Sequence, residues 1–162
     1  MIPTRLDCLI FISFDAVPLA VNFNYDRIKN QQVENILPLI IDLTNPSPSI
    51  GWNNTERMGF KQRPLPDAVF ALALIHHLAI SNNLPLDKIA LFFSEITNNL
   101  IIEFVPKSDS QVKILLESRK DIFTHYEEGS FEKDFELYFD IKEKKNVSES
   151  ERVIYWMKRK RQ

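Results

Sequence analysis

Dense apolar runs alternate along the chain with amphipathic or polar segments, and the clearest of these runs covers residues 68–74. It is uncharged and almost wholly apolar, which is typical of a strand buried on both faces of a parallel sheet. A buried helix is the alternative, because a short apolar run shows no period and Ala and Leu favour helix. We predict a strand, because the polar pair His76–His77 follows at once and suits the carboxyl end of a strand.

The same pattern predicts the other elements. Strands are expected at residues 6–14, 36–41, 100–105 and 152–157, and a short helical turn from 131 should lead into a strand that ends at 141. Helices are expected at residues 17–30, 86–96 and 110–119, the last capped by Ser108 or Asp109. The charged residues 142–151 should form an exposed turn. The turn-rich residues 44–66 should form an ordered loop, since they contain Trp52 and Phe60.

This order of elements predicts the fold class. Strands that alternate with helices predict an α/β fold with a doubly wound, mostly parallel sheet. The last two strands are joined only by a short polar turn, which predicts an antiparallel hairpin at the C-terminus. A chain of 162 residues is long enough for one domain with a sizeable core.

Composition narrows the function classes. A net charge of −2 gives no reason to expect nucleic acid or an anionic membrane as a partner. Cys8 is the one cysteine, so no disulfide framework exists and a cytoplasmic location is the default expectation. No apolar run reaches transmembrane length, and no signal-peptide pattern opens the chain. The three glycines argue against a glycine-rich phosphate loop.

Several segments resemble one family. FISFDAVPLAV, ILPLIIDLTNPSPSIGW, DAVFALALIHHLAI and LIIEFVPKSD are similar to class I S-adenosylmethionine-dependent methyltransferases, in the bacterial branch of NoeA-like nodulation proteins. The resemblance runs from about Leu9 to Met157. It implies a Rossmann-like sheet that ends in an antiparallel hairpin. It also implies transfer of a methyl group from S-adenosylmethionine to a small-molecule acceptor, with catalysis mostly by positioning.

The chain also departs from that family. The family's first strand ends in a glycine-rich turn that lies against the methionine part of the cofactor, and nothing before Asp15 resembles it. We therefore expect a single, partial domain over residues 1–162 that lacks the first strand and helix, with a gap between the second and third predicted strands. Such a gap would expose backbone donors and acceptors. The chain must close it, or a partner chain or second copy must complete the sheet.

Two aspartates are the candidate cofactor ligands. The resemblance implies that Asp15, at the end of one strand, accepts hydrogen bonds from the ribose hydroxyls, and that Asp42 accepts from the adenine amino group. A helix-capping role for Asp15 and an Asx-turn for Asp42 are the structural alternatives.

The acceptor side is expected to contain His76, His77 and Glu103 as candidate catalytic residues. A neutral imidazole can take a proton from an acceptor hydroxyl, but two adjacent residues of a strand face opposite ways, so one histidine at most would be the base. That histidine should lie on the same sheet edge as Asp15. Glu103 lies inside an apolar strand, where a carboxylate needs a partner or a site. The spacing of His and Cys predicts no metal site.

Trp52 and Arg57, in the long loop, are the candidate residues that cover and clamp the acceptor; solvated loop residues are the alternative. Two functions compete on this evidence. The first is a small-molecule methyltransferase domain, truncated and weakly active or inactive alone. The second is a non-catalytic, methyltransferase-like interaction subunit or remnant.

Overall fold

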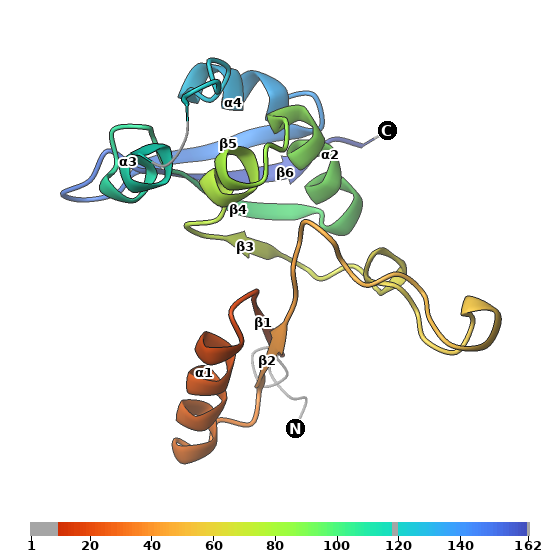
Figure 1. The fold of residues 1–162 in the computed structure, drawn as a ribbon. Helices are drawn as coiled ribbons and strands as arrows, with labels where there is room; N and C mark the ends of the chain where they lie inside the picture. The colour runs from red at the N-terminus through yellow and green to blue at the C-terminus, as the bar shows by residue number, and fades with distance from the viewer. Residues whose placement is uncertain (1–9, 118–119, 162) are drawn as a thin grey trace, which may run out of the picture. The chain divides into compact units, whose positions relative to one another are not determined.

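The computed structural model describes residues 10–117 and 120–161 (Figure 1). These residues form two compact units, with the boundary between Gln62 and Arg63. The expected single domain over residues 1–162 stays a prediction.

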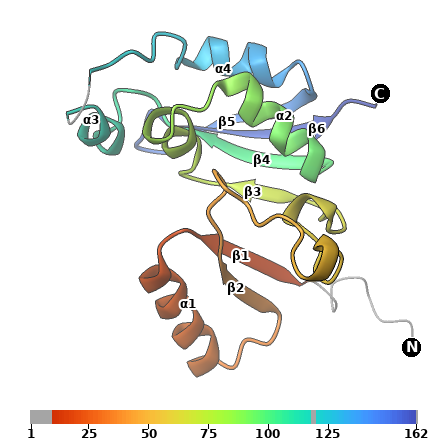
Figure 2. The same ribbon diagram turned by 45° about the vertical axis from the view of Figure 1, so that its right-hand side comes forward.

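The first unit is a strand–helix–strand motif followed by a long loop. Its elements are β1 (Phe11–Asp15), α1 (Pro18–Asn30) and β2 (Ile36–Ile40). The two strands pair in parallel, and α1 runs beside them (Figure 2). The helix begins at Pro18 as predicted, because proline has a fixed φ suited to the first turn and lacks only an N–H that would be unpaired there.

The loop after β2 is ordered, as expected. Short 3₁₀ turns cover Trp52–Asn54 and Phe60–Gln62. The ring of Phe60 packs edge-on against Phe14 of β1, with 5.8 Å between the ring centroids.

The second unit is a four-stranded sheet with helices. Its elements are β3 (Val69–Ala71), a π-helical turn (His77–Ser81), α2 (Leu86–Ile96), β4 (Asn99–Phe104), α3 (Ser110–Glu117), α4 (Glu128–Phe135), β5 (Phe139–Asn146) and β6 (Val153–Arg159). The strand order is β3-β4-β6-β5. β3 and β4 are parallel, whereas β6 is antiparallel to both β4 and β5. The parallel pairs and the C-terminal antiparallel hairpin confirm the predicted fold class.

The described strands thus form two sheets, and β2 and β3 belong to different ones; the expected gap between them stays a prediction. Several boundaries differ from the sequence prediction, two of them by more than two residues. The strand expected at residues 68–74 covers Val69–Ala71 only, and a helical turn begins at Ile75, so both interpretations of that run hold in part. The turn expected at 142–151 is shorter, because β5 continues to Asn146. Residues 6–9 of the first predicted strand lie outside the described residues.

The core of the second unit lies on one face of its sheet. Ile102 of β4 is opposite Tyr155 of β6, and both are fully buried. Phe131 of α4 packs on this face, with its ring centroid 5.1 Å from those of Tyr155 and Phe104. Aromatic side chains therefore join α4 to the two central strands.

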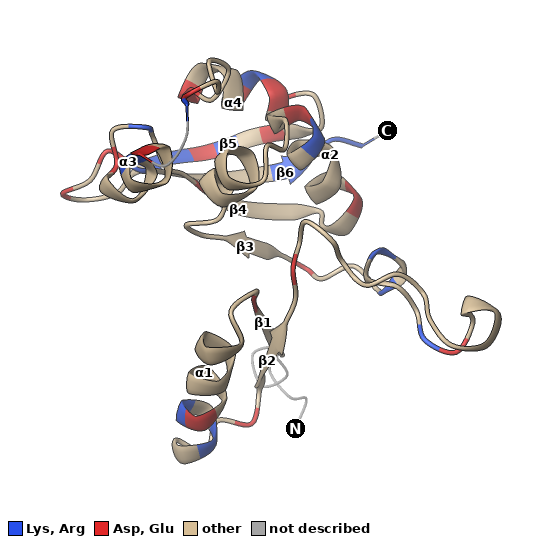
Figure 3. Cartoon of the chain, viewed as in Figure 1, with Lys and Arg blue, Asp and Glu red and all other residues tan. Residues whose placement is uncertain are grey.

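Charged residues of both signs occur along α4 and β5 (Figure 3). Lys144 of β5 lies 2.8 Å from a carboxylate oxygen of Glu128 and 2.7 Å from one of Glu132. The buried hydroxyl of Tyr155 donates to the same two carboxylates, at 2.7 Å each. This ion cluster gives α4 a fixed polar contact with the hairpin. Of the described helices, none has the length and apolar character needed to cross a membrane.

Replacing Phe131 by alanine should lower the free energy of unfolding by about 3–5 kcal/mol, because it removes a fully buried ring from the aromatic contacts between helix and sheet. Leu137→Ala is the matched control, since Leu137 is 61% exposed in the same unit. Its effect should stay within about 0.5 kcal/mol. Urea denaturation followed by circular dichroism measures both, and equal losses in the two variants would contradict this account of the core.

Candidate functional site

Asp15 and Asp42 lie at the carboxyl ends of the two parallel strands of the first unit. Asp15 is opposite Ile40 in the strand register, and Asp42 follows two residues later. Adjacent strands of a sheet lie about 4.8 Å apart, so the two aspartates are neighbours at one sheet edge. The sequence predicted this placement correctly.

Asp42 makes the Asx-turn that was its structural alternative, whereas Asp15 makes a local contact but does not cap α1, whose N-cap residue is Val17 and has no side-chain cap. Asp15 Oδ1 accepts a hydrogen bond of 2.8 Å from the Val17 N–H, just before α1. Asp42 Oδ1 accepts from the N–H of Thr44 at 2.8 Å and from its hydroxyl at 2.7 Å. These bonds to Thr44 lower the pKa of Asp42 below its ordinary value, so the exposed carboxylate is charged at neutral pH. The cofactor-binding roles of both residues stay predictions.

The loop residues Trp52 and Arg57 lie on the surface. The indole of Trp52 is 83% exposed. Arg57 is held through its backbone, which pairs with Ile50 in both directions at 3.1 Å. Backbone hydrogen bonds thus fix the main chain at Arg57. The expected contacts of the Trp52 and Arg57 side chains with an acceptor stay predictions.

His76 and His77 follow β3 but lie in a helical turn, so the expected strand geometry is wrong for this pair. Their ring centroids are 4.2 Å apart, which two adjacent strand residues would not allow. His77 is exposed, whereas His76 is 2% exposed. One histidine of the pair is therefore accessible to an acceptor, and the reason is burial rather than strand alternation.

Burial keeps the imidazole of His76 neutral. It lowers the pKa of His76 to about 4, and the nearby His77 and Arg152 act in the same direction, while Asp109 opposes them. The Nδ1 atom has no hydrogen-bond partner among the described residues. His76 is therefore a buried polar group held next to an accessible one.

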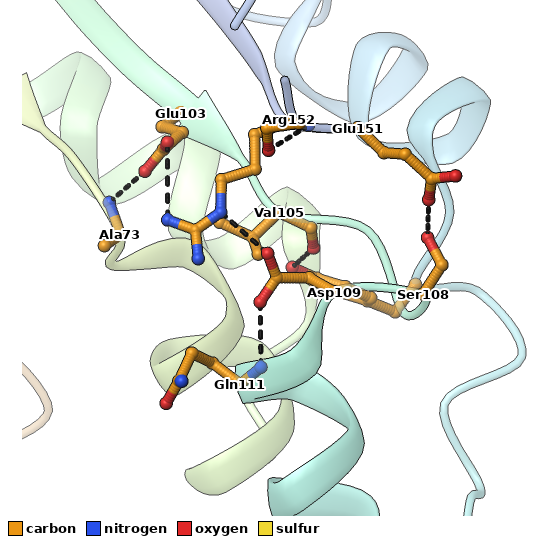
Figure 4. Close-up of polar contacts among 10 residues, drawn as sticks. Ala73, Glu103, Val105, Ser108, Asp109, Gln111, Glu151 and Arg152 are labelled. Carbon is orange, nitrogen blue, oxygen red and sulfur yellow. Dashed lines mark hydrogen bonds and ion pairs between the residues drawn. The ribbon is translucent and has the colours of Figure 1, made fainter. Parts of the chain in front are cut away.

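The carboxylate of Glu103 lies inside an apolar strand, and contacts with a backbone N–H and a guanidinium stabilise it there. Its Oε2 accepts a hydrogen bond of 2.6 Å from the N–H of Ala73, and its Oε1 lies 3.6 Å from Arg152 Nη1 (Figure 4). Ala73 has a φ of +49°, in the left-handed region that residues other than glycine rarely adopt. These contacts give the burial of Glu103 a structural reason, and its catalytic role stays a prediction.

Arg152 is the residue that the sequence analysis missed. Its Nε donates a hydrogen bond of 2.8 Å to Asp109 Oδ2, so one guanidinium contacts two carboxylates from different segments (Figure 4). Asp109 Oδ1 in turn accepts from the Gln111 N–H at 2.9 Å, which confirms its predicted place at the start of α3. Hydrogen bonding to Arg152 lowers the pKa of Asp109 and raises that of the guanidinium. A buried Glu103 implied some cationic partner, but nothing in the sequence pointed to Arg152.

The residues of the second unit that converge here come from four segments: the β3 loop, β4, the start of α3 and the start of β6. No cluster of three or more metal-ligating side chains occurs within residues 10–117 and 120–161. The arrangement provides one exposed imidazole on a loop fixed by buried ion pairs. Such an arrangement can hold the imidazole in one place, and the imidazole can accept a proton from a bound molecule.

Comparison with known proteins identifies one related protein by sequence. The chain is 41% identical over 148 residues to nodulation protein NoeA of Rhizobium meliloti (strain 1021). The match covers 91% of this chain but 31% of NoeA, so the chain spans about a third of the length of that relative. No protein-family model matches the chain.

Solved structures share the fold. An rRNA methylase from Escherichia coli matches with a TM-score of 0.56 and 13% identity, over 96% of this chain and 51% of the methylase. The PH0226 protein from Pyrococcus horikoshii OT3 matches with a TM-score of 0.57 and 13% identity, over 93% of this chain and 72% of that protein. WbdD matches with a TM-score of 0.58 and 10% identity, over 91% of this chain and 30% of WbdD. At these identities the likeness shows the fold alone.

The buried His76 makes stability depend on pH. Between pH 6.5 and about 4 the unfolded chain binds a proton at His76 that the folded chain does not, so stability should fall as the pH falls through this window. The loss should be about 1–3 kcal/mol. Urea denaturation at pH 7, 5.5 and 4 measures it in the wild type and in His76→Leu, which should lack this component.

His125→Gln is the control for this experiment, because it removes an exposed histidine from the same unit. It should keep the wild-type dependence on pH. Identical pH profiles in the wild type and His76→Leu would show that His76 titrates normally in the folded chain.

Proposed function

We propose that the chain belongs with NoeA-like proteins to the class I methyltransferases and forms part of an S-adenosylmethionine-dependent methyltransferase domain, on the strength of its 41% identity to NoeA over 148 residues and its likeness in fold to solved structures that include an rRNA methylase. The reaction would be in-line transfer of the methyl group from the sulfonium of S-adenosylmethionine to an oxygen or nitrogen of the acceptor. The observation that supports it best is the register of β1 and β2, in which two acidic residues end adjacent parallel strands.

The first unit supplies the adenosine side of the proposed site. In open α/β sheets, ligands lie outside the carboxyl ends of the strands, where Asp15 and Asp42 are found. Asp15 would accept hydrogen bonds from the two ribose hydroxyls, and Asp42 would accept one from the adenine amino group. The lowered pKa of Asp42 supports this role, because a charged carboxylate is the stronger acceptor.

In the second unit, taken by itself, the histidine pair holds the proposed catalytic base. His77 is the proposed general base, since it is the exposed member of the histidine pair. The buried His76 would stay neutral beside it and add no competing charge. Trp52 and Arg57, in the loop of the first unit, stay the proposed acceptor-binding residues of that unit.

We propose a small-molecule acceptor. The net charge of −2 gives the chain no overall basic character that would favour a nucleic acid backbone, although the C-terminal residues 158–161 are basic. One structural neighbour is named as an rRNA methylase, so the fold itself is compatible with an RNA acceptor in that protein. RNA is therefore the comparison that any acceptor assay needs.

The chain alone should bind the cofactor weakly. Its three glycines are Gly51 and Gly59, in the loop after β2, and Gly129 in α4; none directly follows a strand. The methionine end of the cofactor would therefore lack the close backbone approach that a glycine-rich turn gives. Several missing hydrogen bonds, at about 1 kcal/mol or more each, would weaken binding by about 3–5 kcal/mol. A micromolar site would become roughly millimolar.

The alternative function is a non-catalytic interaction subunit. Apolar side chains on both strands of the first unit are exposed, among them Ile12 at 53% and Ile40 at 55%. Parallel sheets are ordinarily covered on both faces, so these side chains favour a partner chain or a second copy that completes the sheet.

Saturation-transfer NMR with S-adenosylmethionine detects binding in the millimolar range and identifies the ligand protons in contact. We expect transfer to the adenine and ribose protons of the ligand and little to its S-methyl group. Asp15→Ala should abolish the transfer, because it removes the proposed ribose acceptor. Asp26→Ala, which changes an exposed aspartate of α1 in the same unit, should leave it unchanged.

Isothermal titration completes the test. Transfer that persists in Asp15→Ala would refute the proposed adenosine site. Low-micromolar binding by the wild type that Asp15→Ala abolishes would confirm the site but refute the proposed weakness. Absence of any transfer would leave the interaction subunit as the better account.

A further inference from the structure

We propose that Arg152 is a positioning residue for the loop that carries His76 and His77, because it anchors the carboxylate that holds the Ala73 turn in its left-handed conformation. The proposal rests on the proposed function only in giving that loop to the acceptor side. The contacts themselves belong entirely to the second unit (Figure 4).

The first step is the bond between Glu103 and the loop. The N–H of Ala73 donates to Glu103 Oε2 at 2.6 Å, a distance typical of a strong, charge-assisted hydrogen bond. The φ of +49° at Ala73 is disfavoured for a residue with a Cβ atom. A strong bond to this N–H compensates for the unfavourable backbone, so the conformation of the loop depends on the position of the Glu103 carboxylate.

The second step is the anchoring of that carboxylate. Glu103 is 8% exposed, so its charge needs a compensating cation. Arg152 Nη1 lies 3.6 Å from Oε1, and Arg152 Nε is itself fixed by the 2.8 Å bond to Asp109. The planar guanidinium has donors in a rigid fork, and it spans two carboxylates as a lysine ammonium does not.

The third step links the anchor to the histidines. His76 lies three residues after Ala73, and the N–H of His77 bonds to the carbonyl of Leu74 at 3.0 Å. The left-handed residue therefore sets the direction in which this helical turn leaves β3. A change at Arg152, on a different strand, should alter the environment of His76 without touching the cofactor residues of the first unit.

The test is NMR of the full 162-residue chain, which needs neither cofactor nor activity. In Arg152→Met, amide exchange at Ala73 should become about tenfold faster or more, while exchange at Ile102 in β4 should stay unchanged. The pKa of His76 should rise, because Arg152, which lowers it, is removed while Asp109, which raises it, remains. Arg152→Lys should partly restore the slow amide exchange at Ala73 and the low pKa of His76. Lys158→Met is the matched control, since it removes an exposed cation of β6, the strand that directly follows Arg152, and should change neither.

Unchanged amide exchange at Ala73 in Arg152→Met would overturn the proposal. Equal acceleration of exchange at Ala73 and at Ile102 of β4 would also overturn it. If Arg152→Met does not fold, Asp109→Asn decides, because asparagine can still cap α3 while the charged anchor of Arg152 is lost. Faster exchange at Ala73 in that variant supports the proposal, and wild-type exchange refutes it. Failure of cofactor binding would affect none of these readouts, so the two proposals fail separately.

Discussion

A carboxylate buried in the central region of a sheet must be paired, and this requirement at Glu103 organises one end of the second unit. An unpaired charge in such a place is strongly unfavourable. The structure satisfies it with one backbone donor from the β3 loop and one guanidinium from β6. Asp109 then balances the guanidinium and caps α3. The chain around residues 73, 103–109 and 152 is thus held together by one group of charges, in which Arg152 contacts both carboxylates.

Local patterns in the sequence predicted most elements well. The apolar spacing of residues 86–96 gave the helix α2 with both of its ends, because burial on one face leaves a clear period. Pro18 placed the start of α1, and the strand ends placed Asp15 and Asp42 side by side. These are features that neighbouring residues determine, so a sequence without an alignment is sufficient to predict them.

Features that depend on distant contacts were not predictable. Alanine has no preference for a left-handed backbone, so nothing at Ala73 signalled that β3 would end early and that His76 would lie in a helical turn. Arg152 is separated from Asp109 by 43 residues, and a charged residue beside a polar turn is ordinarily solvated. The sequence therefore identified Glu103 as a residue in need of a partner but could not identify the partner.

The late position of Arg152 has a consequence for how the chain acquires its site. Contacts between residues far apart in sequence form slowly, because loop closure must precede them. During synthesis β3, β4 and α3 emerge before β6. The carboxylates of Glu103 and Asp109 therefore lack their contacts with Arg152 until the hairpin has formed. The histidine loop is consequently among the last parts of the second unit to reach its native geometry. Ribosome-bound intermediates that end before β6 would lack the cation that Glu103 and Asp109 share.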